Sequence, residues 1–220
     1  MDFSNVIKIQ DQFVKETIAT LYMLFWTALI SGIIGLILGI LLILTNEDGL
    51  MPNRTIYSIL DKIVNIGRAI PFIIMLALIS PITRIIVGTV IGNKAAIVPL
   101  VAGSAPFFAR QVQTAMATVN PGVIEAARSM GLAPLEIIRK VWLPESKTAL
   151  IRVSTLTLIS IIGLTAMAGA VGAGGLGKMA ISVGYNRFQN DVILVSTLLI
   201  LVIVFIIQII GSYLERRSIH

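Results

Sequence analysis

The sequence contains no cysteine, and its single histidine is the last residue, His220. The absence of thiols excludes disulfides, cysteine nucleophiles and thiolate metal sites. The absence of an internal imidazole excludes histidine triads and histidine metal ligands from the body of the chain. Charged residues are also scarce, at 13% of 220 residues, whereas 56% are hydrophobic and the mean hydropathy is +0.95. We therefore expect an integral membrane protein with no catalytic residue and no metal site.

Long uncharged runs predict how the chain crosses the membrane, because a bilayer core about 30 Å thick needs about 20 apolar residues in a helix. Three such runs carry no charge, and two weaker candidates contain an arginine and one or two prolines. We predict an all-α membrane protein with five transmembrane helices, forming a single domain over residues 1–220. The predicted spans are 17–46, 56–79, 95–117, 153–177 and 192–214.

An odd number of spans places the two termini on opposite faces of the membrane. The distribution of lysines and arginines then indicates which face is cytoplasmic. With the C-terminus cytoplasmic and the N-terminus outside, the cytoplasmic face carries 11 lysines and arginines and the other face carries 6. The 11 are Arg54, Lys62, Arg68, Arg110, Arg128, Arg139, Lys140, Lys147, Arg152, Arg216 and Arg217. The net charge of +6 is thus explained by orientation, and we expect no nucleic-acid partner.

Small residues four apart predict close contacts between helices. Ser31, Gly35 and Gly39 form such a ridge, which we expect to pack within the chain rather than to form a dimer seam. Residues 172–177, the glycine run, match the dinucleotide-binding pattern G-x-G-x-x-G. That pattern requires a preceding strand, whereas an uncharged run precedes it here. We therefore assign the glycines to backbone conformation and close packing.

Ionisable residues within spans are the usual mark of ion-coupled transport, and none of the 11 acidic residues lies in the middle of a predicted span. Among the cations within predicted spans, Arg68 and Arg110 lie farthest from the span ends. Each could extend to the cytoplasmic interface, or could contact a substrate directly. The sequence leaves both alternatives open.

The only sizeable polar and apolar segment lies between the third and fourth predicted spans. It predicts two short helices, with Asn120 as the N-cap and Pro121 as the first residue of the first helix. Gly131 suits the left-handed position that ends that helix, Pro134 can begin the second helix, and Pro144 is expected to end it. The expected apolar stripes are Val123, Ala127 and Met130, then Leu135, Ile138 and Trp142. Helices this short need a surface to dock on.

A pattern of fixed spacing runs through this segment, residues 120–144. It consists of Glu125, Ala126, Ala127 and Gly131, followed after nine residues by Val141, Leu143 and Pro144. The pattern resembles the EAA loop of bacterial ABC-importer permeases, E-A-A-x-x-x-G, nine residues, then I-x-L-P, and departs from it only at Val141. The resemblance implies a type I ABC-importer permease fold in which this cytoplasmic loop inserts into a cleft of a separate ATP-binding subunit.

Other stretches, at 67–72, 81–89 and 169–177, resemble the methionine-importer permeases of MetNI-type transporters. The resemblance covers nearly the whole chain from about residue 20. It implies a multi-pass protein of the bacterial plasma membrane, acting as a homodimer with two ATP-binding subunits and an extracytoplasmic binding lipoprotein. ATP and magnesium would be bound by the partner ATPase, so no cofactor is expected in this chain. The glycine run would lie beside the outer mouth of the path, where the binding protein docks.

The resemblance also implies roles for single residues. Those expected to couple the loop to the ATPase are Glu125, Ala126, Ala127, Arg128, Gly131, Arg139, Lys140, Leu143 and Pro144. Arg128, Arg139 and Lys140 are candidates for charge contacts with the ATPase, and membrane orientation and solvation are the alternative explanation for these three cations.

For the translocation path we predict Arg68, Pro71, Phe72, Thr165 and Met167. A methionine thioether would give a soft apolar constriction, although plain helix packing would also explain Met167. The expected function is import of L- or D-methionine, driven by ATP hydrolysis in another subunit. The alternatives are a permease for another amino acid, an ion-coupled secondary carrier, and a structural membrane subunit.

Overall fold

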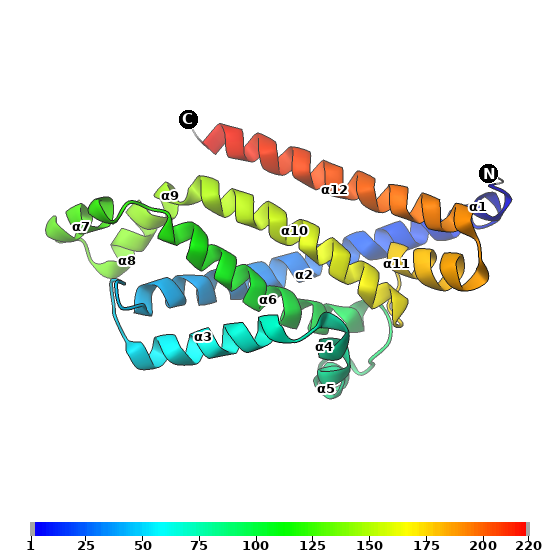
Figure 1. The fold of residues 1–220 in the computed structure, drawn as a ribbon, viewed down its shortest axis with the longest axis horizontal. Coiled ribbons are helices and arrows are strands. Elements are labelled where there is room, and N and C mark those ends of the chain that lie inside the picture. Colours follow the sequence, from blue (N-terminus) through cyan, green and yellow to red (C-terminus); the bar gives the residue numbers. More distant parts are fainter. Residues whose placement is uncertain (1–2, 219–220) are drawn as a thin grey trace.

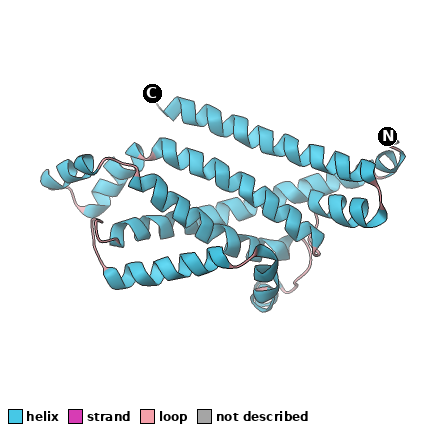
Figure 2. Ribbon diagram, viewed as in Figure 1, coloured by secondary structure: helices cyan, strands magenta, loops and turns pink. Residues whose placement is uncertain are grey.

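The computed structural model describes residues 3–218, and these residues form helices and connecting loops with no strand (Figure 2). In chain order the elements are α1 (Ser4–Lys8), α2 (Gln10–Thr45), α3 (Arg54–Ala69), α4 (Phe72–Leu78), α5 (Ser80–Val87), α6 (Asn93–Ala117), α7 (Pro121–Ser129), α8 (Pro134–Ile137), the π-helical turn η1 (Ile138–Trp142), α9 (Leu143–Glu145), α10 (Lys147–Ala170), α11 (Leu176–Lys178), the π-helical turn η2 (Met179–Gly184), the 3-10 turn η3 (Tyr185–Arg187) and α12 (Asn190–Ser218).

Within residues 3–218, four helices are long and apolar enough to cross a membrane, namely α2, α6, α10 and α12. They confirm four of the five predicted spans. Figure 1 shows them running along the long axis of the molecule, with the start of α2 and the end of α12 at opposite ends.

The prediction of one continuous helix over residues 56–79 is wrong. The chain bends at Ile70 and Pro71, where α3 ends and α4 begins, and α4 and α5 turn away from the direction of α3 (Figure 1). Ile70 is extended, with φ −76° and ψ 121°, because the ring of a following proline disfavours the α-helical conformation. Two helices therefore replace the single predicted one.

The first long helix packs closely against α6. A Cβ atom added to Gly35 would lie 2.9 Å from the carbonyl oxygen of Ala105, and one added to Gly39 would lie 2.7 Å from that of Ala109. Only glycine permits this approach of two backbones. The prediction that the ridge from Ser31 to Gly39 packs within the chain is confirmed.

Three faces can be distinguished on α3. Tyr57, Leu60 and Val64 pack inward. Exposed isoleucines form a second face, with Ile56, Ile59, Ile63 and Ile66 at helical spacing. Asp61, Asn65 and Arg68 form a polar third face on the side of the helix away from the isoleucines. Because an isoleucine face suits lipid and a polar face does not, the polar face must meet protein or water.

Candidate functional site

The 120–144 segment lies at one end of the bundle, around α7 and α8 (Figure 1). Asn120 caps α7 as predicted, because its Oδ1 accepts the N–H of Gly122 at 2.9 Å. Pro121 and Pro134 occupy the first positions of their helices. Gly131 follows with φ +83°, the left-handed conformation that favours glycine. These four local predictions are confirmed.

The prediction that Pro144 ends the second helix is wrong. The helical turns α8, η1 and α9 pass through Pro144 and end at Glu145, and a turn at Ser146, whose N–H bonds to the carbonyl of Trp142, joins them to α10. A proline ring crowds the carbonyl four residues before it and cannot donate a hydrogen bond. The wider π-helical turn immediately before Pro144 changes that spacing, with the N–H of Leu143 reaching back to Ile138.

The apolar side chains of the segment divide differently from the predicted stripes. Ala127, Ile138 and Trp142 are buried as expected, and the indole Nε1 of Trp142 donates to the carbonyl of Met116 at 2.8 Å, at the end of α6. Val123, Met130 and Leu135 were expected on the same stripes but are 40%, 74% and 67% exposed, and Ile137 is buried instead. The segment thus has a buried anchor and an apolar outer surface.

The charged side chains of the segment are all exposed. Lys140 donates to Glu136 at 2.8 Å, and Glu136 also accepts the N–H of Ala133 at 3.2 Å. The hydrogen bond from Lys140, helped by that from Ala133, holds the pKa of the Glu136 carboxyl below its usual value. Arg128 and Arg139 form no ion pair with any residue from 3 to 218.

The remaining predicted coupling residues occupy different environments. Glu125, Ala126 and Pro144 are exposed and Leu143 is half-buried. Glu125 and Arg128 border a cavity of about 620 Å³ between α7 and the loop after α2. Direct contact of these residues with an ATPase stays a prediction.

The glycine run lies at the opposite end of the bundle, and its backbone is held by side chains from distant helices. Glu16, on α2, accepts the N–H of Gly175 at 2.5 Å and the ammonium of Lys178 at 2.8 Å. Thr20 accepts the N–H of Leu176 at 2.8 Å. Asn93, at the start of α6, accepts the N–H of Gly174 at 2.7 Å. Gly172 and Gly175 have φ of +113° and +92°, which only glycine adopts readily.

Glu16 is a residue that the sequence reasoning missed. It was placed outside the first span, whereas α2 begins at Gln10 and the residue is only 7% exposed. One signal in the sequence could have indicated its partner. Glu16 and Lys178 have opposite charges and lie at the ends of two predicted spans on the same predicted face of the membrane.

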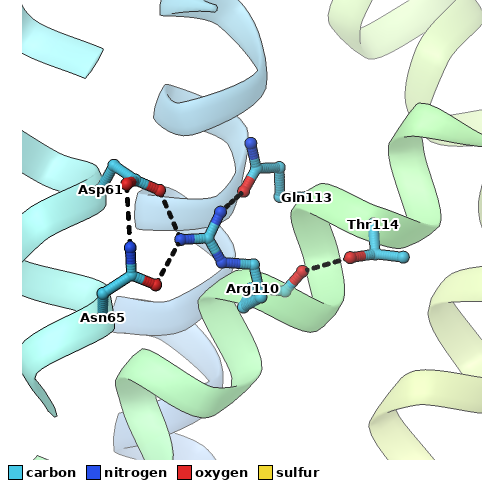
Figure 3. Close-up of polar contacts among 5 residues, drawn as sticks. All are labelled: Asp61, Asn65, Arg110, Gln113 and Thr114. Carbon is cyan, nitrogen blue, oxygen red and sulfur yellow. Dashed lines mark hydrogen bonds and ion pairs between the residues drawn. The ribbon is translucent and has the colours of Figure 1, made fainter. Parts of the chain in front are cut away.

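Arg110 lies in a polar network between α3 and α6 (Figure 3). Its Nη2 donates to Asp61 at 2.5 Å and to Asn65 at 2.9 Å, and its Nη1 donates to Gln113 at 2.7 Å. Asn65 in turn donates to the other oxygen of Asp61 at 2.9 Å. Asp61 of the neighbouring helix compensates the charge of Arg110, a partner that neither predicted alternative included.

Arg68 has a different environment. Together with Pro71 and Phe72 it lines a cavity of about 360 Å³ where the bend after α3 meets α6 and α10. Thr165 and Met167 do not line this cavity: the hydroxyl of Thr165 donates to the carbonyl of Ile162, and Met167 is 41% exposed. The structure brings together three of the five residues predicted for the path, and a path role for all five stays a prediction.

In the part of the chain that the structure describes, no group of three or more histidine, cysteine, aspartate or glutamate residues could hold a metal ion.

Comparisons with known proteins give a consistent result. A family described as "Binding-protein-dependent transport system inner membrane component" matches residues 31–220. A Vibrio cholerae protein named "Probable D-methionine transport system permease protein MetI" is 43% identical over 210 residues, covering 96% of this chain and 93% of the relative. The Bacillus subtilis "Methionine import system permease protein MetP" is 50% identical over 176 residues, covering 80% of this chain and 79% of the relative.

A solved structure has the same fold. A chain from inward-facing conformations of the MetNI methionine ABC transporter superposes with a TM-score of 0.94 at 42% identity, covering 96% of this chain and 98% of that chain. A chain from an amino acid ABC transporter superposes with a TM-score of 0.82 at 20% identity, which shows a shared fold.

Proposed function

The chain belongs to the family of binding-protein-dependent transport system inner membrane components, and from that membership we propose that it is the permease of an ABC importer for L- or D-methionine. As a membrane component of this family, the chain is a transport subunit and not an enzyme, and its fold is that of the type I ABC permeases. The proposed substrate follows the names of relatives that are 43% and 50% identical to the chain.

The proposal that a separate ATPase supplies the energy for transport rests on the 120–144 segment. Its buried anchor, Trp142, fixes it to α6, while its outer surface exposes Met130 and Leu135 together with Arg128 and Arg139. An exposed apolar surface rimmed by cations without protein partners is typical of a docking site for another protein. We assign this surface to the ATP-binding subunit, which would hold ATP and magnesium.

The other proposed subunits would complete the translocation path, hydrolyse ATP and deliver the substrate. Two copies would enclose the path about a twofold axis, with two ATPase subunits on the paired 120–144 segments and a binding lipoprotein at the opposite face. The N-terminus would lie outside and the C-terminus in the cytoplasm of a bacterial cell. Closure of the ATPase subunits would open the path outward, and hydrolysis would return it to the inward-facing state.

A bulky substitution at Gly131 tests this assignment. Gly131→Trp should leave the chain folded and inserted but reduce ATP-driven uptake to background, because the side chain would project from the docking surface. Gly88→Trp is the matched control, since Gly88 has φ +81° and, like Gly131, no atom within 4 Å of an added Cβ. The measurement is methionine uptake into proteoliposomes holding the complete transporter. Normal uptake by Gly131→Trp would contradict the coupling role.

The substrate and the energy source are tested in the same preparation. Competition by a panel of amino acids should show that L- and D-methionine compete best, and stronger competition by another amino acid would favour the alternative permease. The permease reconstituted without its ATPase should not transport under an ion gradient. Uptake under those conditions would instead indicate a secondary carrier.

A further inference from the structure

The cavity at the bend between α3 and α4 combines charged, polar and apolar walls. We propose that it is a subsite that holds a zwitterionic amino acid during translocation, with separate groups for its carboxylate and its ammonium. The inference rests on the proposed function and deepens it by naming the residues that recognise the substrate. The cavity volume of about 360 Å³ falls in the range of about 300–1,000 Å³ that is typical of small-molecule sites.

The carboxylate would bind to Arg68 and Ser160. Both residues are exposed and line the cavity, Arg68 from the end of α3 and Ser160 from α10. Neither forms a hydrogen bond or ion pair with any residue from 3 to 218. The forked donors of the guanidinium match a carboxylate, and they face the cavity without a partner among these residues. The hydroxyl of Ser160 can donate to the same group.

The ammonium would bind to hydroxyl oxygens on the neighbouring walls. Ser104 donates its proton to the carbonyl of Leu100 at 2.6 Å, and Thr157 donates to that of Val153 at 2.8 Å. Because these protons are committed to the backbone, both oxygens present lone pairs to the cavity as acceptors. No aspartate or glutamate lines the cavity, so a cation without a carboxylate would face Arg68 unfavourably.

The remaining walls are apolar and suit an uncharged side chain. Phe72, Phe107 and Leu164 line the cavity beside the polar groups. The other arginine of this region cannot serve in the same way, because Arg110 already donates to Asp61, Asn65 and Gln113 (Figure 3). The arrangement therefore favours an amino acid with an apolar side chain.

The absence of cysteine makes a direct test possible. In the complete transporter, Ser160→Cys supplies the single thiol of this chain, and its alkylation by N-ethylmaleimide is followed with and without L-methionine. Methionine at ten times its dissociation constant should slow alkylation about tenfold by mass action. Leu164→Cys is a second reporter that keeps every proposed polar contact. The amine that corresponds to methionine without its carboxylate should give no protection.

Matched variants distinguish the loss of methionine binding in the cavity from general effects of a substitution on the transporter. Arg68→Gln should abolish protection of Leu164→Cys, whereas Lys62→Gln, which removes an equal charge from α3 outside the cavity, should preserve it. Ser154→Cys, on the same helix as Ser160 but outside the cavity, should be alkylated at one rate with or without methionine.

Two outcomes would overturn the inference while leaving the proposed function intact. One is equal alkylation of both reporters with and without methionine, in complexes whose wild-type form takes up methionine. The other is protection that survives Arg68→Gln. Failure of the wild-type complex to take up methionine would instead refute the proposed substrate.

Discussion

At the end of the bundle where α2 begins, side chains from α2 and α6 hydrogen-bond the backbone of the glycine run, whereas at the opposite end the 120–144 segment is anchored by apolar burial and one indole hydrogen bond. The polar side chains that hold the glycine run, Glu16, Thr20 and Asn93, bond to its backbone. Arg128 and Arg139 of the 120–144 segment form no hydrogen bond or ion pair with residues 3–218. The comparison indicates that contacts within the chain fix the conformation of the glycine run. The outer surface of the 120–144 segment is available to a partner.

Removal of the Glu16 carboxylate should have the largest effect on stability. Glu16→Ala would leave the buried N–H of Gly175 without its acceptor and Lys178 without its counterion. Hydrogen bonds to charged groups contribute about 1.5–3 kcal/mol each, so we expect a lower unfolding midpoint in detergent. Asp11→Ala is the matched control, because Asp11 is an exposed acid of the same helix. Equal midpoints for the two variants would show that the glycine run does not depend on Glu16.

Loss of the indole hydrogen bond should have a smaller effect at the other end. Trp142→Phe keeps most of the buried ring but removes one of the donors to the carbonyl of Met116, which still accepts the N–H of Val119, at a cost of about 1 kcal/mol. Hydrogen exchange should become faster over residues 120–144 and stay unchanged in the glycine run. Faster exchange at both ends would mean that the two loops are not independent.

Acidification should give the smallest effect, confined to the start of α8. The lowered pKa of Glu136 means that its bonds to Lys140 and Ala133 stabilise the fold fully above the usual carboxyl pKa. That stabilisation is lost as the pH falls through the lowered pKa. Because both side chains are exposed, the change should appear as local hydrogen exchange rather than as unfolding. Glu136→Gln should remove the pH dependence, and its persistence in that variant would exclude Glu136 as the cause.

Local features of the 120–144 segment could be predicted because each depends on a few neighbouring residues. Asn120, Pro121, Gly131 and Pro134 have conformational preferences that act within one helical turn. The passage of the helix through Pro144 could not be predicted in this way, because it depends on the π-helical turn over 138–142, which no single-residue preference indicates. The single membrane helix expected over 56–79 does not form, because Pro71 disfavours the α-helical conformation at Ile70.

Contacts between residues that are far apart along the chain could not be predicted from the sequence. Glu16 and Gly175 are 159 positions apart, and Asp61 and Arg110 are 49 positions apart. Helical periodicity shows which side of a helix is polar but not which neighbour that side faces. Arg68 and Arg110 therefore appeared equivalent in the sequence, and the packing of α3 on α6 distinguishes them.

The turns α8, η1 and α9 meet α10 at the single residue Ser146, so α10 is a long arm attached directly to the 120–144 segment. At a rise of about 1.5 Å per residue, the 24 residues of α10 extend over about 36 Å. A small tilt applied at one tip is amplified into a larger sweep at the other, and Thr157 and Ser160 lie along the moving arm. Movement of the 120–144 segment would thus reach the walls of the cavity through a connection of one residue, Ser146.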